Sequence, residues 1–402
     1  MPYSSGISSP TLSQQSQCLE LDYHDDFQSD YFQSIESFLQ RLCVHANQLD
    51  RDPDALRQAF NRLGEAGILG IKGPKAWGGE QLPSSAFCRV QEIMARYSGA
   101  LAFLQNQHQN AVSKLSDSTN EVLQGRYLSD AIQGQIGIGV AFSHLRRIAQ
   151  PCMNAEPVSG GYRISGKTPW ITGYRFFQFF ILAATLPDQR VVLGLLPFDS
   201  IEQHYGGSIA LSEPMQLASM TSTNTVQASL NQWFLPTENV IGFKDKNWIH
   251  QSDRLNILNH FFILGCARAG LDVVEKASHQ PYASAQIRPT WMALDQRLNH
   301  CCQHIYHAQV QAEALGREGL EGKDIDKHVK HFVHLRAQAI DLAARCAHAA
   351  VIVSRGVANV LDHPAQRIYR ESLAFSVFGQ TTPVMEASLA QLVHSSIPIE
   401  DG

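Results

Sequence analysis

Two stretches of the chain carry histidines at the spacing that places side chains on one face of a helix. Residues at i, i+4 and i+7, or at i, i+3 and i+6, lie on one side of a helix, so their imidazoles could converge on a metal ion. Neither stretch has the Glu-x-x-His pattern that would add a carboxylate ligand, and the polar faces of solvated helices account for the spacing. We therefore predict no metal site at the two runs, which are His300, His304 and His307, and His328, His331 and His334.

A second group of chemically capable side chains follows a short apolar run that ends at Ala141. It contains Ser143, His144, Arg146 and Arg147 within five residues. A guanidinium can hold an anionic group through two parallel hydrogen bonds. A basic loop that only faces water has the same composition, and the sequence leaves both interpretations open.

The composition limits the classes of function in which these residues can take part. The chain has 402 residues, of which 44% are hydrophobic and 17% are charged, so it can bury a large core and is not disordered. Its formal charge is −5 and no run of five like charges occurs, so we predict no nucleic-acid partner. We also expect no membrane span, because no apolar run approaches eighteen residues, and no secretory signal in the Ser- and Gln-rich start.

The eight cysteines are scattered along the chain and form no Cys-x-x-Cys pair. Such spacing suits reduced thiols better than a disulfide framework. We therefore predict a cytoplasmic protein.

The order of sequence patterns predicts an α+β fold made of three consecutive blocks. Residues 1–28 are expected to be a flexible N-terminus, and 29–135 a helical domain with apolar residues at helical spacing. Residues 136–242 carry short apolar runs separated by turn signals, which predicts a middle antiparallel β domain. Residues 243–402 are expected to form a C-terminal four-helix bundle, with helices at 255–277, 291–315, 327–353 and 364–392.

Three segments in this order resemble the acyl-CoA dehydrogenase superfamily, and the resemblance covers about residues 29 to 397. The first is Leu63–Ile71 with Trp77-Gly-Gly79, the second is the strand Ile164–Gly173 ending in Trp-Ile-Thr-Gly, and the third is Arg367-Ile-Tyr-Arg370 followed by Gly379–Thr381. Leu235–Ile241 is similar to the strand that closes the family's β domain.

The resemblance implies a cofactor, a substrate class and an assembly. Members of the family bind FAD between the subunits of a homodimer or homotetramer. A base removes the α-proton of an acyl thioester while hydride leaves the β-carbon for the flavin. The implied partners are therefore a small acyl substrate, as a CoA or carrier-protein thioester, an electron acceptor and a second copy of the chain.

Carried over by the resemblance, the cofactor-binding positions are Val140, Ala141, Ser143, Trp170, Ile171, Thr172, Arg288, Gly356 and Thr381. In the family the Trp packs beside the flavin ring and the Thr hydroxyl reaches its N5 side. The chain departs from the pattern at Ala141, where the family has Thr. It departs again around Arg288 and Gly356, which are what remains of the diphosphate-binding segments.

The catalytic turn is the central departure. The family reads Tyr-Glu-Gly-Thr there, and the matching stretch is Phe378-Gly379-Gln380-Thr381, with Gly379 in place of the glutamate. The family's second location for a base falls at about Leu258. Neither residue can remove a proton, although the Gly379 N–H and the Gln380 side chain could still polarise a carbonyl.

The sequence therefore predicts an FAD-dependent oxidoreductase that acts on the CH–CH group of an acyl thioester or a related substrate, with doubtful activity on standard acyl-CoAs. One alternative is a flavin-dependent monooxygenase or oxidase on the same fold, which needs no glutamate base. Another is a non-catalytic interaction protein that retains the fold. Consumption of O₂ by the reduced protein would distinguish the first alternative from a dehydrogenase. A colourless protein that takes up no FAD would indicate the second.

Overall fold

The N-terminal part of the chain is helical in the computed structural model, which describes residues 30–146, 152–204, 206–258, 261–318 and 323–394. The expected flexible segment 1–28 lies outside the described residues. Local sequence signals set the helix starts: Asp52 accepts the N–H groups of Asp54 and Ala55, and Ser98 accepts that of Leu101. The helices are α2 (Asp30–Leu42), α3 (Ala46–Leu49), α4 (Pro53–Glu65), α5 (Ser84–Tyr97), α6 (Gly99–Ser116) and α7 (Glu121–Ile132).

The loop between α4 and α5 is tightly folded, as its glycines suggest. A Cβ atom at Gly79 would lie 2.2 Å from the Gly73 carbonyl oxygen, and one at Gly73 would lie 2.6 Å from Ile132. A Cβ atom at Gly70 would also lie 2.8 Å from Ile132, and these close approaches explain why the family-like Leu63–Ile71 and Trp77-Gly-Gly79 segments need glycine.

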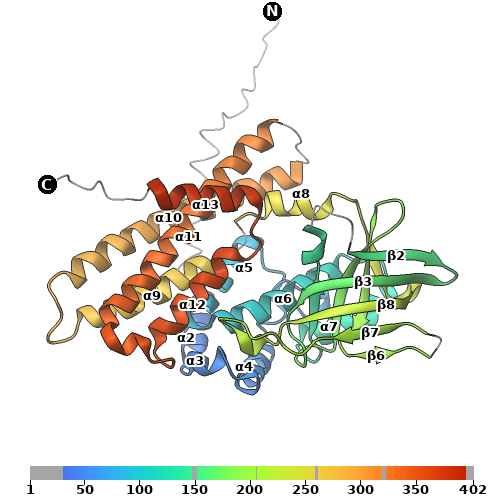
Figure 1. The fold of residues 1–402 in the computed structure, drawn as a ribbon, viewed down its shortest axis with the longest axis horizontal. Helices are drawn as coiled ribbons and strands as arrows, with labels where there is room; N and C mark the ends of the chain where they lie inside the picture. The colour runs from blue at the N-terminus through green and yellow to red at the C-terminus, as the bar shows by residue number, and fades with distance from the viewer. Residues whose placement is uncertain (1–29, 147–151, 205, 259–260, 319–322, 395–402) are drawn as a thin grey trace, which may run out of the picture.

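One nine-stranded sheet forms the middle of the chain (Figure 1). Its path is β6-β7-β8-β3-β2-β4-β5-β9, and β1 joins it by pairing with β4. The expectation of an antiparallel domain is wrong at two pairings, because β1 is parallel to β4 and β2 meets β4 in parallel register at Asn154 and Thr185. The strands are β1 (Ile138–Ala141), β2 (Met153–Val158), β3 (Gly161–Ile171), β4 (Phe179–Thr185), β5 (Val191–Pro197), β6 (Ile201–Glu202), β7 (Ser208–Leu211), β8 (Val226–Pro236) and β9 (Val240–Lys244).

The C-terminal part is a helical bundle that lies beside the sheet (Figure 1). The expected last helix, 364–392, is instead two helices with a turn at 378–381 between them. A short helix, α8, also precedes the bundle. The helices are α8 (Trp248–Leu255), α9 (Phe262–Ser278), α10 (Ile287–Glu318), α11 (Lys323–Ser354), α12 (Pro364–Val377) and α13 (Thr382–His394).

A buried histidine connects the first helices to the sheet. His108 on α6 lies in the core, where its Nε2–H donates to Ala131 O at 2.9 Å and its Nδ1 accepts the Ile138 N–H at 3.2 Å. Both bonds require the neutral imidazole with hydrogen on Nε2. Burial lowers the pKa of His108 to about 4, although the two backbone bonds act in the opposite direction. The start of β1 is thereby fixed against α6 and α7.

Within the described parts of the chain, no helix is both long enough and apolar enough to cross a bilayer.

Candidate functional site

The ends of β1 and β3 bring the predicted β-domain residues together. A Cβ atom at Gly139 on β1 would lie 3.2 Å from Thr172 O, so the two strand ends are neighbours. The helical turn η2 (Ser143–Arg146) follows β1 directly and packs against β3. Val140, Ala141 and Ser143 therefore lie beside the segment Trp170–Thr172, as the resemblance implied.

Trp170 and Thr172 face different surroundings, although they are two residues apart. The Trp170 side chain is 49% exposed, which is unusual for a tryptophan in the middle of a folded domain. The Thr172 hydroxyl is buried and lies 3.0 Å from the Thr225 hydroxyl. The Trp170 ring is therefore accessible at the surface, whereas the Thr172 side chain is held in the interior by its hydrogen bond with Thr225.

The Ser143 hydroxyl is an unsatisfied polar group next to β3, the strand that carries Trp170. Its hydroxyl oxygen is buried and has no hydrogen-bond partner among the described residues. Buried hydroxyl groups are almost always paired, so an unpaired one marks a position where a ligand or water completes the structure.

The residues at this end of the sheet fit a flavin ring. A planar aromatic ligand would cover the exposed Trp170 indole, and its polar edge would satisfy the Ser143 hydroxyl. The neighbouring His144 is committed to structure, since Nε2 bonds Ala183 O at 2.8 Å and Nδ1 lies 3.2 Å from the Thr168 hydroxyl. Arg146 pairs in bidentate geometry with Asp253, so it holds α8 rather than a ligand, and Arg147 lies outside the described residues.

The predicted catalytic turn joins α12 to α13. Gly379 has φ = +54°, a conformation that favours glycine, and Gln380 is exposed, with its N–H 3.3 Å from Val377 O. Thr381 precedes α13, and its carbonyl accepts the Met385 N–H at 2.9 Å. No carboxylate is present at 378–381, as the sequence indicates.

Aromatic side chains fill the space beside this turn. The Phe103 and Phe378 rings are 4.5 Å apart, and Phe375 stacks on Phe262 at 5.3 Å. Leu258, the second family position for a base, is buried and lines a cavity of only about 10 Å³. The turn and the α8–α9 connection are therefore packed closely together.

Arg336 on α11 lies between these two segments, and the sequence interpretation missed it. Its Nη1 donates to Ile257 O at 2.8 Å and its Nη2 donates to Phe378 O. The side chain is buried, and its Nε has no partner among the described residues. A single arginine among the apolar positions of α11, between Leu335 and Ala337, was the only signal in the sequence.

Three further side chains, Glu371, Glu386 and His144, could act as a base, and two of them are engaged within the fold. Glu371 is fully buried, pairs with Arg367 at 2.7 Å and accepts the Gly99 N–H at 3.1 Å. Glu386 lies exposed on α13, and His144 makes the two bonds given above.

The predicted diphosphate-binding residues lie far from the Trp170 end. Arg288 is in the first turn of α10, and Gly356 is in η5 (Arg355–Asn359), which follows α11. Figure 1 shows that the α9–α10 connection lies at the end of the bundle away from the sheet. Arg288 is exposed, and a Cβ atom at Gly356 would meet nothing within 4 Å. One subunit does not bring the two groups together.

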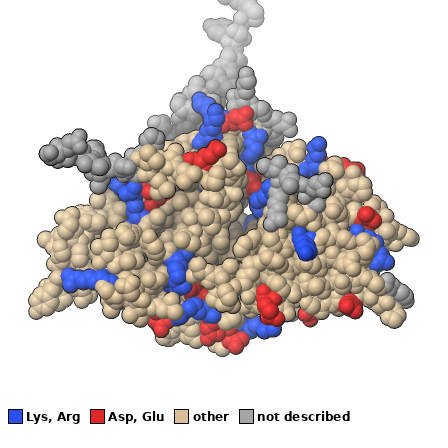
Figure 2. Space-filling view, in the orientation of Figure 1, with Lys and Arg blue, Asp and Glu red and all other residues tan. Residues whose placement is uncertain are grey.

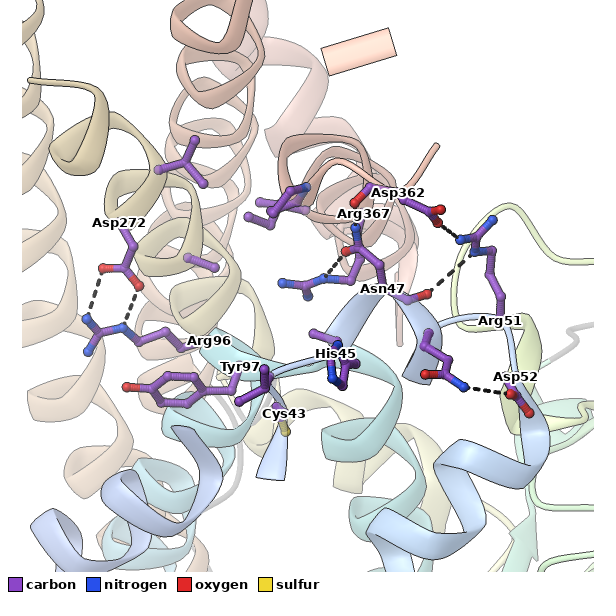
Figure 3. A pocket seen from close by; sticks show the side chains of 17 residues that line it. Cys43, His45, Asn47, Arg51, Asp52, Arg96, Tyr97, Asp272, Asp362 and Arg367 are labelled. Carbon is purple, nitrogen blue, oxygen red and sulfur yellow. Dashed lines mark hydrogen bonds and ion pairs between the residues drawn. The ribbon is translucent and has the colours of Figure 1, made fainter. Parts of the chain in front are cut away.

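A cavity of about 780 Å³ opens between α3, α9 and α12, and it contains none of the predicted site residues (Figure 3). Its charged side chains already have partners: Arg96 forms a bidentate pair with Asp272, and Arg51 pairs with Asp362. The walls therefore carry little free charge with which to hold an ionic cofactor.

The two histidine runs lie on the outer faces of α10 and α11. The Nε2 atoms of His300 and His304 are 3.0 Å apart, and both side chains are exposed. In the described residues, no set of three or more His, Cys, Asp or Glu side chains is arranged to hold a metal ion.

Known proteins of similar sequence include acyl-CoA dehydrogenases. A sequence model of the acyl-CoA dehydrogenase N-terminal domain matches residues 25–135. The mitochondrial isovaleryl-CoA dehydrogenase of Pongo abelii is 24% identical over 374 residues, which cover 88% of this chain and 85% of that protein.

Solved structures share the fold at low sequence identity. Butyryl-CoA dehydrogenase from Megasphaera elsdenii matches with a TM-score of 0.72 and 15% identity, over 91% of this chain and 98% of that one. The FAD complex of PigA matches with a TM-score of 0.71 and 17% identity, over the same shares of the two chains. The chain therefore has the helix–sheet–helix fold of the acyl-CoA dehydrogenases, and its residues 25–135 match the N-terminal domain of that family.

Proposed function

We propose that the protein is an FAD-dependent oxidoreductase that acts on the CH–CH group of an acyl thioester or a related substrate. One observation carries the proposal: the strand that bears the half-exposed Trp170 packs against the η2 turn, whose Ser143 hydroxyl is buried and has no described partner. One relative that is similar to this chain over most of its length is named isovaleryl-CoA dehydrogenase, a name that describes oxidation of an acyl-CoA.

The chain's own residues would bind and orient rather than transfer protons. FAD, when bound, supplies the acceptor for a hydride. Trp170 would cover the ring, Ser143 would bond its polar edge, and Thr172 would be held in place by Thr225. At the opposite side of the site, the Gly379 N–H would polarise a substrate carbonyl.

The missing base limits which substrates the enzyme can use. Removal of an α-proton from a saturated acyl thioester needs a base within a few ångströms, and general bases contribute roughly 10²–10⁴ to the rate. Leu258 and Gly379 offer none, so we expect weak or absent dehydrogenation of simple straight-chain acyl-CoAs. A flavin oxidase or monooxygenase on the same fold is the second candidate, and the absence of a carboxylate at both positions favours it.

We also propose that the protein is a homodimer or homotetramer. Tyr369, Leu373 and Val377 are exposed at intervals of four residues on α12, which makes one apolar stripe. A second stripe runs along α13 through Met385, Leu389, Leu392 and Val393. Figure 2 shows broad areas without charged side chains on this side of the molecule. A second copy of the chain would cover both stripes.

A cytoplasmic location remains our proposal, and the thiols support it. The cysteines of the described residues are all free, and most are buried. Reduced thiols are typical of a cytoplasmic protein.

The spectrum of the purified protein tests the cofactor. We expect flavin absorption near 450 nm, either as isolated or after FAD is added and the excess removed. Bleaching by an acyl-CoA would indicate a dehydrogenase, and O₂ consumption by the reduced protein would indicate the oxidase or monooxygenase. A colourless protein that takes up no FAD contradicts the proposal and supports the non-catalytic alternative.

A further inference from the structure

Arg336 is placed where two helices end. Its Nη1 donates to Ile257 O, two residues beyond the end of α8, and its Nη2 donates to Phe378 O, the C-cap of α12. Unpaired carbonyls at a helix C-terminus carry partial negative charge and favour a cation. The guanidinium thus satisfies the C-cap carbonyl of α12 and a carbonyl just beyond α8, and it joins the two segments.

The residues that it joins are the neighbours of the two family positions for a base. Ile257 precedes Leu258, and Phe378 precedes Gly379. Beside the two positions where the resemblance places a carboxylate, this chain therefore holds a buried cation that reaches both segments.

No described acid neutralises this cation directly. Asp253 is the acid whose charge acts on Arg336, but both of its carboxylate oxygens are engaged by Arg146, at 2.7 and 2.8 Å. Burial lowers the pKa of Arg336 to about 10, and Asp253 partly opposes that shift, so the guanidinium stays charged at neutral pH. Arg336 therefore places a positive charge beside the α12–α13 turn at neutral pH.

We propose that Arg336 is the positioning residue of the candidate site: it holds the α8–α9 connection and the α12–α13 turn together, and its charge weakens a carboxylate at either position as a base. A carboxylate at position 379 would lie within a few ångströms of the guanidinium and would act as its ion-pair partner. The pKa of that carboxylate would fall and its strength as a base with it. The site would instead stabilise negative charge on a bound molecule.

This inference rests on the proposed function only in treating 257–258 and 378–381 as parts of an active site. Neither of the two measurements below uses flavin or turnover. A protein that binds no FAD can therefore still support or overturn the role of Arg336.

The first experiment tests the connection by hydrogen exchange of backbone amides. In Arg336→Met, exchange should rise at least about tenfold in peptides covering both 252–258 and 376–382. Arg336→Lys keeps the charge but not the planar fork, so it should fall between Met and wild type. Arg345→Met on the same helix is the matched control, because Arg345 forms only a partly exposed pair with Asp341. Unchanged exchange in either segment of a folded Arg336→Met protein overturns the positioning role, and Arg336→Lys decides the question if Arg336→Met does not fold.

The second experiment tests the charge. Gly379→Glu and its isostere Gly379→Gln share the strain of a side chain at φ = +54°, so their difference in stability reports the carboxylate alone. A lowered folded-state pKa adds stability above the unfolded pKa, and this stability is lost as the pH falls through the folded one. In the Gly379→Glu variant with Arg336 present, the pKa of the introduced carboxyl group should lie at least about one unit below its value in the Arg336→Met background. Equal pKa values in the two backgrounds overturn the electrostatic part of the proposal.

Discussion

The hydroxyl oxygens of Thr172 and Thr225 lie 3.0 Å apart in the interior, on neighbouring strand ends. Thr225 also lies 3.4 Å from the Thr223 hydroxyl, so a short row of hydroxyl groups supports the strand behind Trp170. One hydroxyl can both donate and accept, which lets Thr172 keep this bond and still bond a ligand on its other side. The proposed flavin contact and the structural contact are therefore compatible.

Trp170→Ala should weaken FAD binding with little loss of stability, because the side chain is half exposed and covers little core. Thr172→Ala should cost roughly 1–2 kcal/mol of stability, since it leaves Thr225 without this partner. The ratio of flavin to protein absorbance reports binding, and urea unfolding reports stability. Phe243→Ala is the matched control, because it truncates another half-exposed aromatic in the same sheet, one that contacts Tyr162 at the opposite end of β3. Unchanged FAD affinity in the Trp170→Ala, Thr172→Ala double variant would place the cofactor elsewhere.

Wild-type protein should oxidise butyryl-, octanoyl- and palmitoyl-CoA weakly or not at all in an assay with an artificial electron acceptor. Gly379→Glu should create some activity, because it places a carboxylate in the family position. The gain should be partial, since φ is positive there and Arg336 lowers the carboxylate's pKa. Combining Gly379→Glu with Arg336→Met should shift the pH–rate profile to higher pH, because the pKa of the introduced carboxyl group rises when the guanidinium is removed. Rapid turnover by the wild-type protein would mean that a base comes from another residue.

Acid should destabilise the fold through His108. Its pKa is about 4 in the folded protein against an ordinary value of 6.5, so the unfolded chain binds the extra proton first. The lowered pKa therefore gives stability above about pH 6.5, and about 3 kcal/mol is lost as the pH falls to about 4. Urea unfolding at pH 7 and pH 4.5 measures this.

The variant His108→Gln isolates the effect, because an amide can donate to Ala131 O and accept from Ile138 without titrating. It should lose less stability between the two pH values than the wild type does. His250→Gln, at an exposed position on α8, should behave like the wild type. Identical pH dependence in wild type and His108→Gln would remove His108 as the cause.

Charges on the exposed apolar stripes should break the assembly. Burial of each leucine side chain is worth about 1.5–3 kcal/mol, so Leu373→Glu with Leu389→Glu removes several kcal/mol from a symmetric interface. Light scattering should show the wild type as a dimer or tetramer and the double variant as a monomer. Val122→Glu, an equally exposed apolar position on α7, should leave the assembly intact. A wild-type protein that is monomeric at micromolar concentration would refute the proposal.

The sequence predicted the order of helices, sheet and helices because periodicity and turn residues are local signals. The apolar periodicity missed the break between α12 and α13, which only the resemblance indicated, although Gly379 and Pro383 are ordinary signals for a helix end and a helix start.

Contacts between residues far apart in the chain could not be predicted from the sequence. Arg336 lies 79 residues from Ile257 and 42 from Phe378, and only the folded bundle brings them together. The parallel pairing of β1 with β4 was equally hidden, because the alternation of side chains in a strand is the same for either direction.

The separation of Trp170 from Arg288 and Gly356 has a consequence for how the protein would respond to dilution. If FAD spans two subunits, as the resemblance implies, binding of the cofactor and association of the chains are thermodynamically coupled. Each would then strengthen the other by the same factor: added FAD would lower the concentration at which the chains associate, and dilution would release FAD without any competitor. Cellular abundance of the chain itself would thus decide how much of it carries the cofactor.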